Sequence, residues 1–253
     1  MTPPPATGFP LVVFDCDSTL TTLEGIDELS QTRREEIAAL TEQAMSGGMD
    51  FTLALDRRLA ILQPTRGQLE ALGERYAAHP TPDARAVIAA LHALGKAVYI
   101  VSGGFKVALD VFGRTLGLEG ERVVAVDLAF DAEGRYHAVR REGEWNVLAG
   151  KDRIVTRLQE RHGSPALVVG DGATDLATAP VAGLFAGYGG VAVRERVRAE
   201  APVFLPDPSL APVLALAASA GERKTLRAGP HGALLEKGET LLRQALHAHR
   251  SRD

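Results

Sequence analysis

The sequence has little of the residue types that mark several protein classes. It contains one cysteine, Cys16, so the chain cannot form an internal disulfide. No stretch approaches the roughly 20 apolar residues that a membrane-spanning helix requires, and the first residues lack the features of a secretory signal peptide. A net charge of −4 gives no basic surface for nucleic acid. These absences favour a reduced, cytoplasmic protein that binds neither nucleic acid nor membrane.

What remains is the composition of an ordinary globular protein. Hydrophobic residues make up 45% and charged residues 24% of the 253 positions. A chain of this length can bury a large core, and its length permits one domain or two.

The most informative segment follows the apolar stretch of residues 11–14, which is expected to be a strand. That stretch ends in two carboxylates, Asp15 and Asp17, and in an open α/β sheet ligands bind at this edge. One carboxylate can bind a divalent cation and attack phosphorus while its neighbour moves a proton. The pair therefore predicts an enzyme that forms an aspartyl-phosphate.

A second apolar stretch, residues 97–101, is followed by Ser102, Gly103 and Gly104. A hydroxyl followed by two glycines at the start of a helical segment offers a donor side chain and unobstructed backbone amides. Such a segment is suited to binding a phosphate group.

Two later segments continue the pattern. Lys151 opens an amphipathic helix, and its ammonium can neutralise phosphate oxygens during transfer. The apolar residues 166–169 lead into a glycine-flanked turn that carries Asp171 and Asp175. Two acids at this spacing fit a metal ligand and a residue that supports the site.

In this order, the four motifs are similar to those of the haloacid dehalogenase superfamily of phosphatases. Within it, the strings FDCDSTLTTLEGIDELS, IVSGGF and GDGATDLATAP resemble the phosphoserine phosphatase family. The resemblance covers roughly residues 10–215. It implies an α/β fold with a Rossmann-like three-layer core, a mostly parallel sheet and a helical cap inserted after the first strand. It also implies Mg²⁺ as the cofactor.

The resemblance implies a role for each motif residue. Asp15 would be the nucleophile, and Asp17 would protonate the leaving alcohol and then deprotonate the hydrolytic water. Mg²⁺ would be bound by the carboxylates of Asp15 and Asp171 and by the backbone carbonyl of Asp17.

The same resemblance implies how the phosphate is held. Ser102, the Gly103 amide and Lys151 would bind the phosphate oxygens, and Thr174 would be a further substrate contact. Asp175 would orient Lys151 and a water ligand of the metal. The catalytic residues implied in this way are Asp15, Asp17, Ser102, Lys151 and Asp175.

The implied substrate is O-phospho-L-serine, whose ammonium and carboxylate each need a partner of opposite charge. In the family, a Glu nine residues after the nucleophile binds the ammonium, and this position is Glu24. Alignment on residues 48–51 assigns the carboxylate to Arg58 and places Phe51 over the substrate. An alignment shifted by one residue would exchange Arg58 for Arg57.

Each assignment has a plainer alternative. Ser102 could be a turn residue, Lys151 a solvated lysine, Glu24 a surface acid, Arg58 an exposed arginine and Phe51 a core aromatic.

The predicted organisation has four parts. Residues 1–9 are proline-rich and expected to be flexible. Residues 10–23 and 80–217 would form the phosphatase core. About 80 residues separate the first motif from Ser102, far more than a simple crossover needs, which predicts a helical cap over residues 24–79.

Residues 218–253 form a C-terminal extension that departs from the family pattern. Their helix-like stretch, residues 233–249, carries an apolar stripe. Packing on the body is the favoured interpretation, and a homodimer contact is the alternative. Elsewhere, a hairpin is expected around residues 123–139, and short strands near 183–186 and 202–205.

Three functional hypotheses remain open. The first is hydrolysis of O-phospho-L-serine. The second keeps the chemistry but changes the substrate to another small phosphate monoester such as phosphohomoserine, or transfers the phosphoryl group to an alcohol such as homoserine. The third is a receiver whose aspartate is phosphorylated as a signal, which would need neither a helical insertion nor Asp17.

Overall fold

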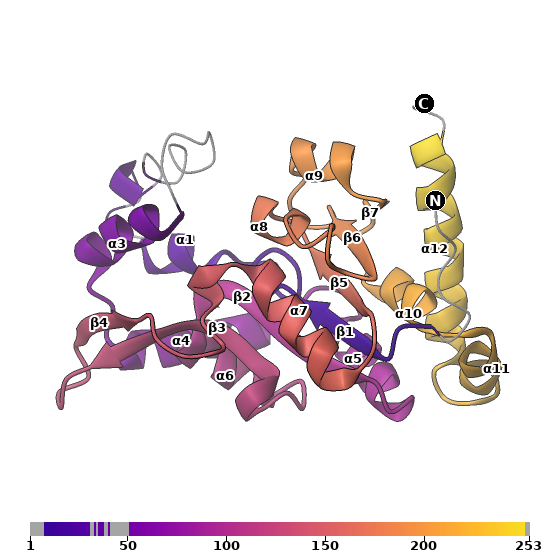
Figure 1. Cartoon of the computed structure of the whole chain (residues 1–253), viewed down its shortest axis with the longest axis horizontal. Helices are drawn as coiled ribbons and strands as arrows, with labels where there is room; N and C mark the ends of the chain where they lie inside the picture. Colours follow the sequence, from indigo (N-terminus) through magenta and orange to yellow (C-terminus); the bar gives the residue numbers. More distant parts are fainter. Residues whose placement is uncertain (1–7, 31–32, 34, 38–39, 41–50, 251–253) are drawn as a thin grey trace.

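The computed structural model describes residues 8–30, 33, 35–37, 40 and 51–250 (Figure 1). Its centre is a seven-stranded sheet of order β4-β3-β2-β1-β5-β6-β7, in which only the β3–β4 pair is antiparallel. The strands are β1 (Leu11–Phe14), β2 (Ala97–Phe105), β3 (Val123–Phe130), β4 (Tyr136–Arg140), β5 (Ala166–Gly170), β6 (Leu184–Tyr188) and β7 (Val203–Leu205). The predicted α/β class and mostly parallel sheet are confirmed.

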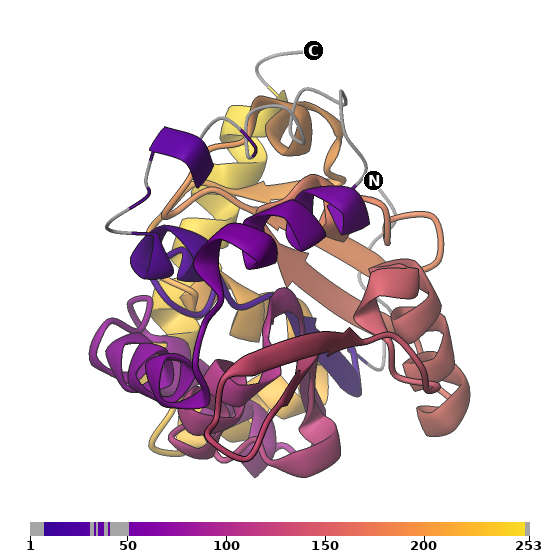
Figure 2. The same cartoon turned by 90° about the vertical axis from the view of Figure 1, so that its left-hand side faces the viewer.

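Helices surround this sheet (Figures 1 and 2). They are α1 (Gly25–Leu29), α3 (Phe51–Leu62), α4 (Arg66–Ala78), α5 (Ala84–Ala93), α6 (Lys106–Arg114), α7 (Lys151–His162), α8 (Ala173–Leu176), α9 (Glu195–Glu200), α10 (Ala211–Ala217), α11 (Ala220–Ala228) and α12 (Gly232–Arg250). None of the helices in the described part of the chain is long and apolar enough to cross a membrane.

The central strand β1 fixes the position of the candidate site. Its four residues are fully buried, as expected for a parallel strand that is covered on both faces. Phe14 pairs with Ile100 of β2 on one side and with Val169 of β5 on the other. The ends of all three strands therefore meet at one edge. Strand β1 lies where the strand order reverses, with β2 to β4 on one side and β5 to β7 on the other.

Strand β2 is longer than predicted. The strand was expected over residues 97–101, with residues 102–104 at the start of a helical segment, but these residues continue the strand to Phe105, and α6 begins at Lys106. The pairing of β2 with β3 shifts register between Val101 and Phe105. Glycines inside a strand are typical of such an irregularity, which keeps the backbone in extended form while redirecting it.

Other elements agree with the pattern of the sequence. The hairpin is confirmed as the antiparallel β3–β4 pair, whose turn is closed by Asp131 Oδ1 accepting from the amides of Glu133 and Arg135. The two short strands are confirmed as β6 and β7.

A helical insertion lies between β1 and β2, as predicted. Its helix α4 begins with a capping box, in which Thr65 and Gln68 satisfy each other's backbone amides, and it packs along α6. The chain enters and leaves the insertion side by side, because Thr22 donates to the His79 carbonyl and Thr81 donates to that of Leu20. The domain boundaries remain predictions, and residues 1–7 of the predicted flexible segment lie outside the described residues.

The C-terminal helix α12 packs on α10 and β7 through its apolar stripe, in which Leu235 is fully buried (Figure 1). Helices α10 and α12 approach so closely at Gly238 that a Cβ there would lie 2.2 Å from the carbonyl oxygen of Ala211. The favoured interpretation of this stripe, packing on the body, is thus confirmed, whereas a homodimer stays a prediction.

An ion pair between a buried lysine and a half-buried glutamate joins the C-terminal extension to the core. The side chain of Lys96, just before β2, is 2% exposed, and its Nζ lies 2.8 Å from Oε1 and 3.0 Å from Oε2 of Glu222 in α11. Burial acts to raise the pKa of the Glu222 carboxyl, but hydrogen bonds from Lys96 and Ser219 outweigh it and lower the pKa.

We expect Glu222→Gln to lower the free energy of unfolding by about 2 to 3 kcal/mol, because it leaves the Lys96 ammonium buried without a charged partner. Urea denaturation followed by circular dichroism measures the change. Glu236→Gln, at an exposed position of α12, is the control and should leave stability within about 0.5 kcal/mol of the original. Equal midpoints for the two variants would contradict the role of the pair.

Candidate active site

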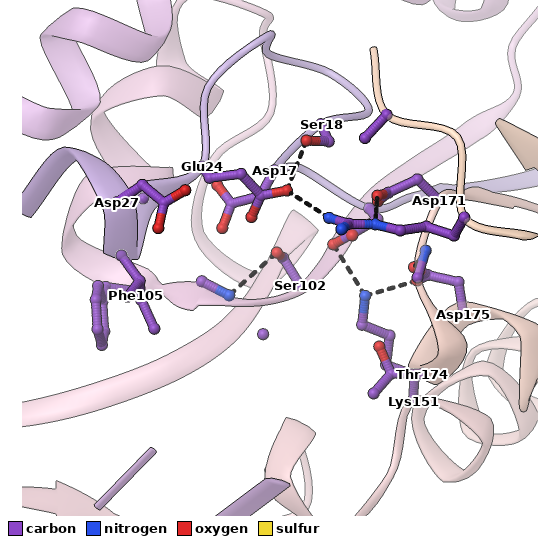
Figure 3. Close-up of a pocket in the computed structure, with 18 of the residues that line it drawn as sticks. Asp17, Ser18, Glu24, Asp27, Ser102, Phe105, Lys151, Asp171, Thr174 and Asp175 are labelled. Carbon is purple, nitrogen blue, oxygen red and sulfur yellow. Dashed lines mark hydrogen bonds and ion pairs between the residues drawn. The ribbon is translucent and has the colours of Figure 1, made fainter. Parts of the chain in front are cut away.

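A cavity of about 410 Å³ opens at the C-terminal edge of β1, β2 and β5 (Figure 3). It is lined by residues from all the sequence motifs and from the helical insertion. These include Asp15, Asp17, Ser18, Glu24, Asp27, Arg58, Ser102, Gly103, Gly104, Lys151, Asp171, Thr174, Asp175 and Arg194. Segments far apart in the sequence are thus brought to one place, because β1 pairs with β2 on one side and with β5 on the other.

Lys151, the first residue of α7, holds the centre of the site. Its Nζ lies 2.9 Å from Asp15 Oδ1 and 2.6 Å from Asp175 Oδ1, and all three side chains are buried. Burial alone would lower the pKa of the ammonium, but the two carboxylates outweigh this and raise it. Lys151 is therefore charged, and the alternative of a solvated surface lysine is wrong.

Asp175 is held from two sides. Its Oδ1 accepts from Lys151, and its Oδ2 accepts from the backbone amide of Gly172 at 3.0 Å. Because both oxygens already have protein donors, this carboxylate is suited to orienting the lysine. Burial, reinforced by the charge of Asp15, raises the pKa of Asp175 to about 8 against the opposing effect of Lys151.

The carboxylates of Asp15, Asp171 and Asp175 form a cluster that fits a divalent cation. One oxygen of each lies within 4.8 Å of the others, and all three residues are buried. Burial and the charge of Asp15 raise the pKa of Asp171 to about 7. Three acids share one lysine here, and carboxylate oxygens are the ligands that Mg²⁺ prefers. The backbone carbonyl of Asp17 as a further ligand stays a prediction.

Asp17 lies beside this cluster, with one carboxyl oxygen in a short hydrogen bond. Tyr76 of α4 donates its hydroxyl to Asp17 Oδ1 at 2.5 Å. Burial, and then the charge of Glu24, raises the pKa of Asp17 well above its usual range. A buried carboxyl whose pKa is raised in this way is suited to act as a general acid.

The candidate phosphate contacts face the same space. Ser102 is buried, and its Oγ accepts from the amide of Gly104 at 3.1 Å. Gly103 and Thr174 also line the cavity. A Cβ at Gly104 would lie 3.3 Å from Asp17 Oδ2, so glycine keeps this part of the cavity open.

The candidate substrate acid, Glu24, has two partners. Its Oε1 accepts from Ser18 Oγ at 2.6 Å and from Arg194 Nη2 at 3.0 Å. Burial raises the pKa of Glu24, and the contacts to Ser18 and Arg194 oppose the rise. Glu24 lines the cavity, so its alternative as a plain surface acid does not describe its position.

Arg58 and its neighbour have opposite environments. Arg58 of α3 is buried and lines the cavity, whereas Arg57 is exposed. Burial lowers the pKa of the Arg58 guanidinium, and the charges of Asp27 and Glu24 oppose this. Within the described residues, the buried Nε of Arg58 has no hydrogen-bond partner, which leaves a donor available at the cavity.

Phe51 is the first residue of α3, but its side chain and residues 48–50 lie outside the described part of the chain. The suggestion that it covers the substrate therefore stays a prediction. Cys16 is fully buried, and burial followed by the charge of Asp17 raises the pKa of its thiol, which keeps the sulfur protonated and unreactive.

Sequence reasoning missed two residues of the site. Arg194, at the start of α9, bridges Glu24 and Asp171, with its Nε 3.2 Å from Asp171 Oδ2. Its position in the loop after β6, another strand ending at this edge, is a signal that could have identified it. Tyr76 has no such signal, because an aromatic residue within a helical pattern predicts only a core contact.

Comparison with known proteins places this geometry in context. A model of haloacid dehalogenase-like hydrolases matches residues 9–183. A phosphoserine phosphatase of Bos taurus is 34% identical over 199 residues, which cover 78% of this chain and 88% of that protein. A solved structure, a phospho-aspartyl intermediate analogue of phosphoserine phosphatase, is similar to this chain with a TM-score of 0.70 and 29% identity. The matched region covers 82% of this chain and 98% of that one. A substrate-bound phosphoserine phosphatase complex is similar with a TM-score of 0.68 and 28% identity, and the matched region covers 82% of this chain and 97% of that one.

We expect Mg²⁺ to raise the melting temperature, because a free concentration a hundredfold above Kd stabilises a folded protein by about 2.7 kcal/mol. Asp171, with its pKa raised to about 7, must lose its proton to bind the cation. Protons therefore compete below that pH, and the rise should be larger at about pH 8 than at about pH 6. Differential scanning fluorimetry measures both effects.

Asp171→Asn should abolish this Mg²⁺-dependent rise, whereas Glu70→Gln, at an exposed site on α4, should retain it. A rise of equal size in the Asp171→Asn variant would show that the cation binds elsewhere.

Proposed function

Because the chain belongs to the haloacid dehalogenase-like hydrolase family, we propose that it hydrolyses O-phospho-L-serine to L-serine and phosphate through an aspartyl-phosphate on Asp15. The observation that carries this proposal is one cavity holding both a carboxylate–lysine cluster and, at its other side, Glu24 and Arg58. The similarity to phosphoserine phosphatases over most of the chain supports it. The proposal includes Mg²⁺ dependence and a role in serine biosynthesis in the cytoplasm.

The first step would form the phosphoenzyme. A carboxylate oxygen of Asp15 attacks phosphorus, and the bond from phosphorus to the serine oxygen breaks. Asp17 gives its proton to that oxygen, so that serine leaves as a neutral alcohol. The raised pKa of Asp17 supports this role as an acid.

The second step would release phosphate. A water oxygen attacks phosphorus, Asp17 takes a proton from the water, and the bond from phosphorus to the Asp15 oxygen breaks. Asp15 is regenerated as a carboxylate and Asp17 as an acid, so both are ready for another cycle.

Charge neutralisation would accompany both steps. The Lys151 ammonium, fixed by Asp175 at 2.6 Å, faces Asp15 and would hold the phosphate oxygens together with Ser102 and Gly103. Bound Mg²⁺, held by Asp15 and Asp171, would supply further positive charge to the phosphate.

Recognition of serine would depend on the two ends of the amino acid. Glu24 is an acid for the ammonium, and Arg58 offers for the carboxylate an Nε donor that has no partner among the described residues. A pocket with both charges favours an amino acid over a plain phosphate ester. Another small phosphate monoester, or transfer to an alcohol such as homoserine, is distinguished by the substrate tests below.

We expect Arg58→Ala to lower kcat/KM for O-phospho-L-serine by about 30- to 100-fold, because a charge-assisted contact to the substrate carboxylate is lost. Hydrolysis of p-nitrophenyl phosphate, which lacks that carboxylate, should change by less than about threefold. Colorimetric phosphate release measures both.

Arg57→Ala is the matched control, since this neighbouring arginine is exposed, and it should leave both activities nearly unchanged. A similar loss on both substrates for Arg58→Ala would remove its assignment to the substrate carboxylate. Activity on p-nitrophenyl phosphate alone in the original protein would reject serine as the leaving group.

We expect acid-quenched protein to carry ³²P after mixing with labelled O-phospho-L-serine and Mg²⁺, with the label released by hydroxylamine as for an acyl phosphate. Asp15→Asn should carry no label and release no phosphate, because an amide oxygen is a poor nucleophile. Label retained in the Asp15→Asn variant would place the nucleophile elsewhere.

A further inference from the structure

The hydrogen bond from Tyr76 to Asp17 connects the helical insertion to the reacting group. Tyr76 lies on α4, and its hydroxyl donates to Asp17 Oδ1 at 2.5 Å. Asp17 follows β1 at the sheet edge, so the bond joins residues that are 59 positions apart in the chain. None of the four sequence motifs includes Tyr76.

The two oxygens of Asp17 have different surroundings. Oδ1 is occupied by the tyrosine hydroxyl. Oδ2 lies over Gly104, since a Cβ there would be 3.3 Å from Oδ2 and 3.4 Å from Ser102 Oγ. Oδ2 is therefore the oxygen that faces the candidate phosphate contacts.

The tyrosine is fixed in place by its neighbours. Tyr76 is fully buried, and its ring meets Phe112 of α6 edge-on, with ring centroids 6.0 Å apart. On the other side, a Cβ at Gly25 would lie 2.1 Å from the Tyr76 hydroxyl oxygen. The hydroxyl fits only because residue 25 has no side chain, and it has little room to move away from Asp17.

We propose that Tyr76 is a positioning residue for Asp17, whose O–H bond to Oδ1 fixes the carboxyl and leaves Oδ2 to carry the transferred proton. This inference rests on the proposed function. The proton moves from Asp17 Oδ2 to the serine oxygen in the first step and from water to Oδ2 in the second. The Tyr76 proton stays on its own oxygen throughout.

This arrangement makes the general acid depend on the seating of α4. When α4 packs against α6, the carboxyl is held with Oδ2 toward the substrate, and without that contact it can rotate about its side-chain bonds. A displacement of about 1 Å in a catalytic group can cost about a hundredfold in rate.

The test separates this role from a purely structural one by the leaving group. The serine oxygen must receive a proton to leave as an alcohol, whereas p-nitrophenolate leaves without one. Tyr76→Phe should therefore lower kcat/KM for O-phospho-L-serine by about 10- to 30-fold and for p-nitrophenyl phosphate by less than about threefold. The ratio kcat/KM is used because it contains only the steps up to departure of the leaving group.

Tyr99→Phe is the matched control. Tyr99 is also buried, and its hydroxyl is hydrogen-bonded to His162 Nε2 at 2.9 Å, away from the cavity. It should change the two kcat/KM values equally or not at all. Thermal denaturation of both variants shows whether each is folded at the assay temperature.

Gly25→Ala provides a second test that keeps the tyrosine. The new Cβ would displace the Tyr76 hydroxyl and should selectively reduce phosphoserine turnover. In a Tyr76→Phe background the hydroxyl is absent, and the nearest remaining atoms are Leu72 Cδ2 at 3.3 Å and Tyr76 Cζ at 3.4 Å. The double variant should then be no worse than Tyr76→Phe alone.

Equal losses on both substrates, or no loss, in a folded Tyr76→Phe variant would overturn the positioning role while leaving the proposed function intact. Additive losses in the Gly25→Ala and Tyr76→Phe double variant would also contradict it. If the original protein hydrolyses another alkyl phosphate instead of phosphoserine, the same comparison is made with that ester. Absence of all phosphate release by the original protein would overturn the proposed function and this inference with it.

Discussion

At the C-terminal edge of β1, the buried carboxylates of Asp15, Asp171 and Asp175 cluster together, and the ammonium of Lys151 contacts two of them, Asp15 and Asp175. Burial raises the pKa values of Asp171 and Asp175, and repulsion from the nearby charge of Asp15 adds to the rise. The lysine offsets part of it, and Arg194 offsets more through Asp171. Three acids against these two cations leave a net negative site suited to a divalent cation. The arrangement of the other residues follows from this balance of charge.

The sheet topology creates that balance, and the helical insertion gives it selectivity. Strand β1 lies between β2 and β5, so three strand ends deliver their polar residues to one edge. The insertion then supplies Glu24 and Arg58, which line the cavity, and Tyr76, which donates a hydrogen bond to Asp17. The core thus provides the phosphoryl chemistry, and the insertion provides the groups that would select a substrate and position Asp17. The extension of α11 and α12 lies beyond the matched family region and is joined to the core by packing on α10 and by the Lys96 ion pair.

The sequence predicted the sheet and the motif residues well, because each motif follows a run of apolar residues that is recognisable as a buried strand. It was less successful where side chains meet across the fold. The predicted end of β2 was wrong, since the apolar run stops at residue 101 and the structure continues the strand through the two glycines that follow. The alignment assigned Arg58, but a shift of one residue would have exchanged it for Arg57. In the structure Arg58 is buried and lines the cavity, whereas Arg57 is exposed.

The sequence by itself determined the α/β class, the order of the motifs and the type of chemistry that those residues support. These features depend on local periodicity and on residue types at strand ends, which are written directly in the chain. Only the tertiary structure decided that Tyr76 meets Asp17 and that Arg194 joins Glu24 to Asp171. Such contacts depend on how helices are seated on the sheet, and no local pattern specifies the distance between residues that lie far apart in the sequence.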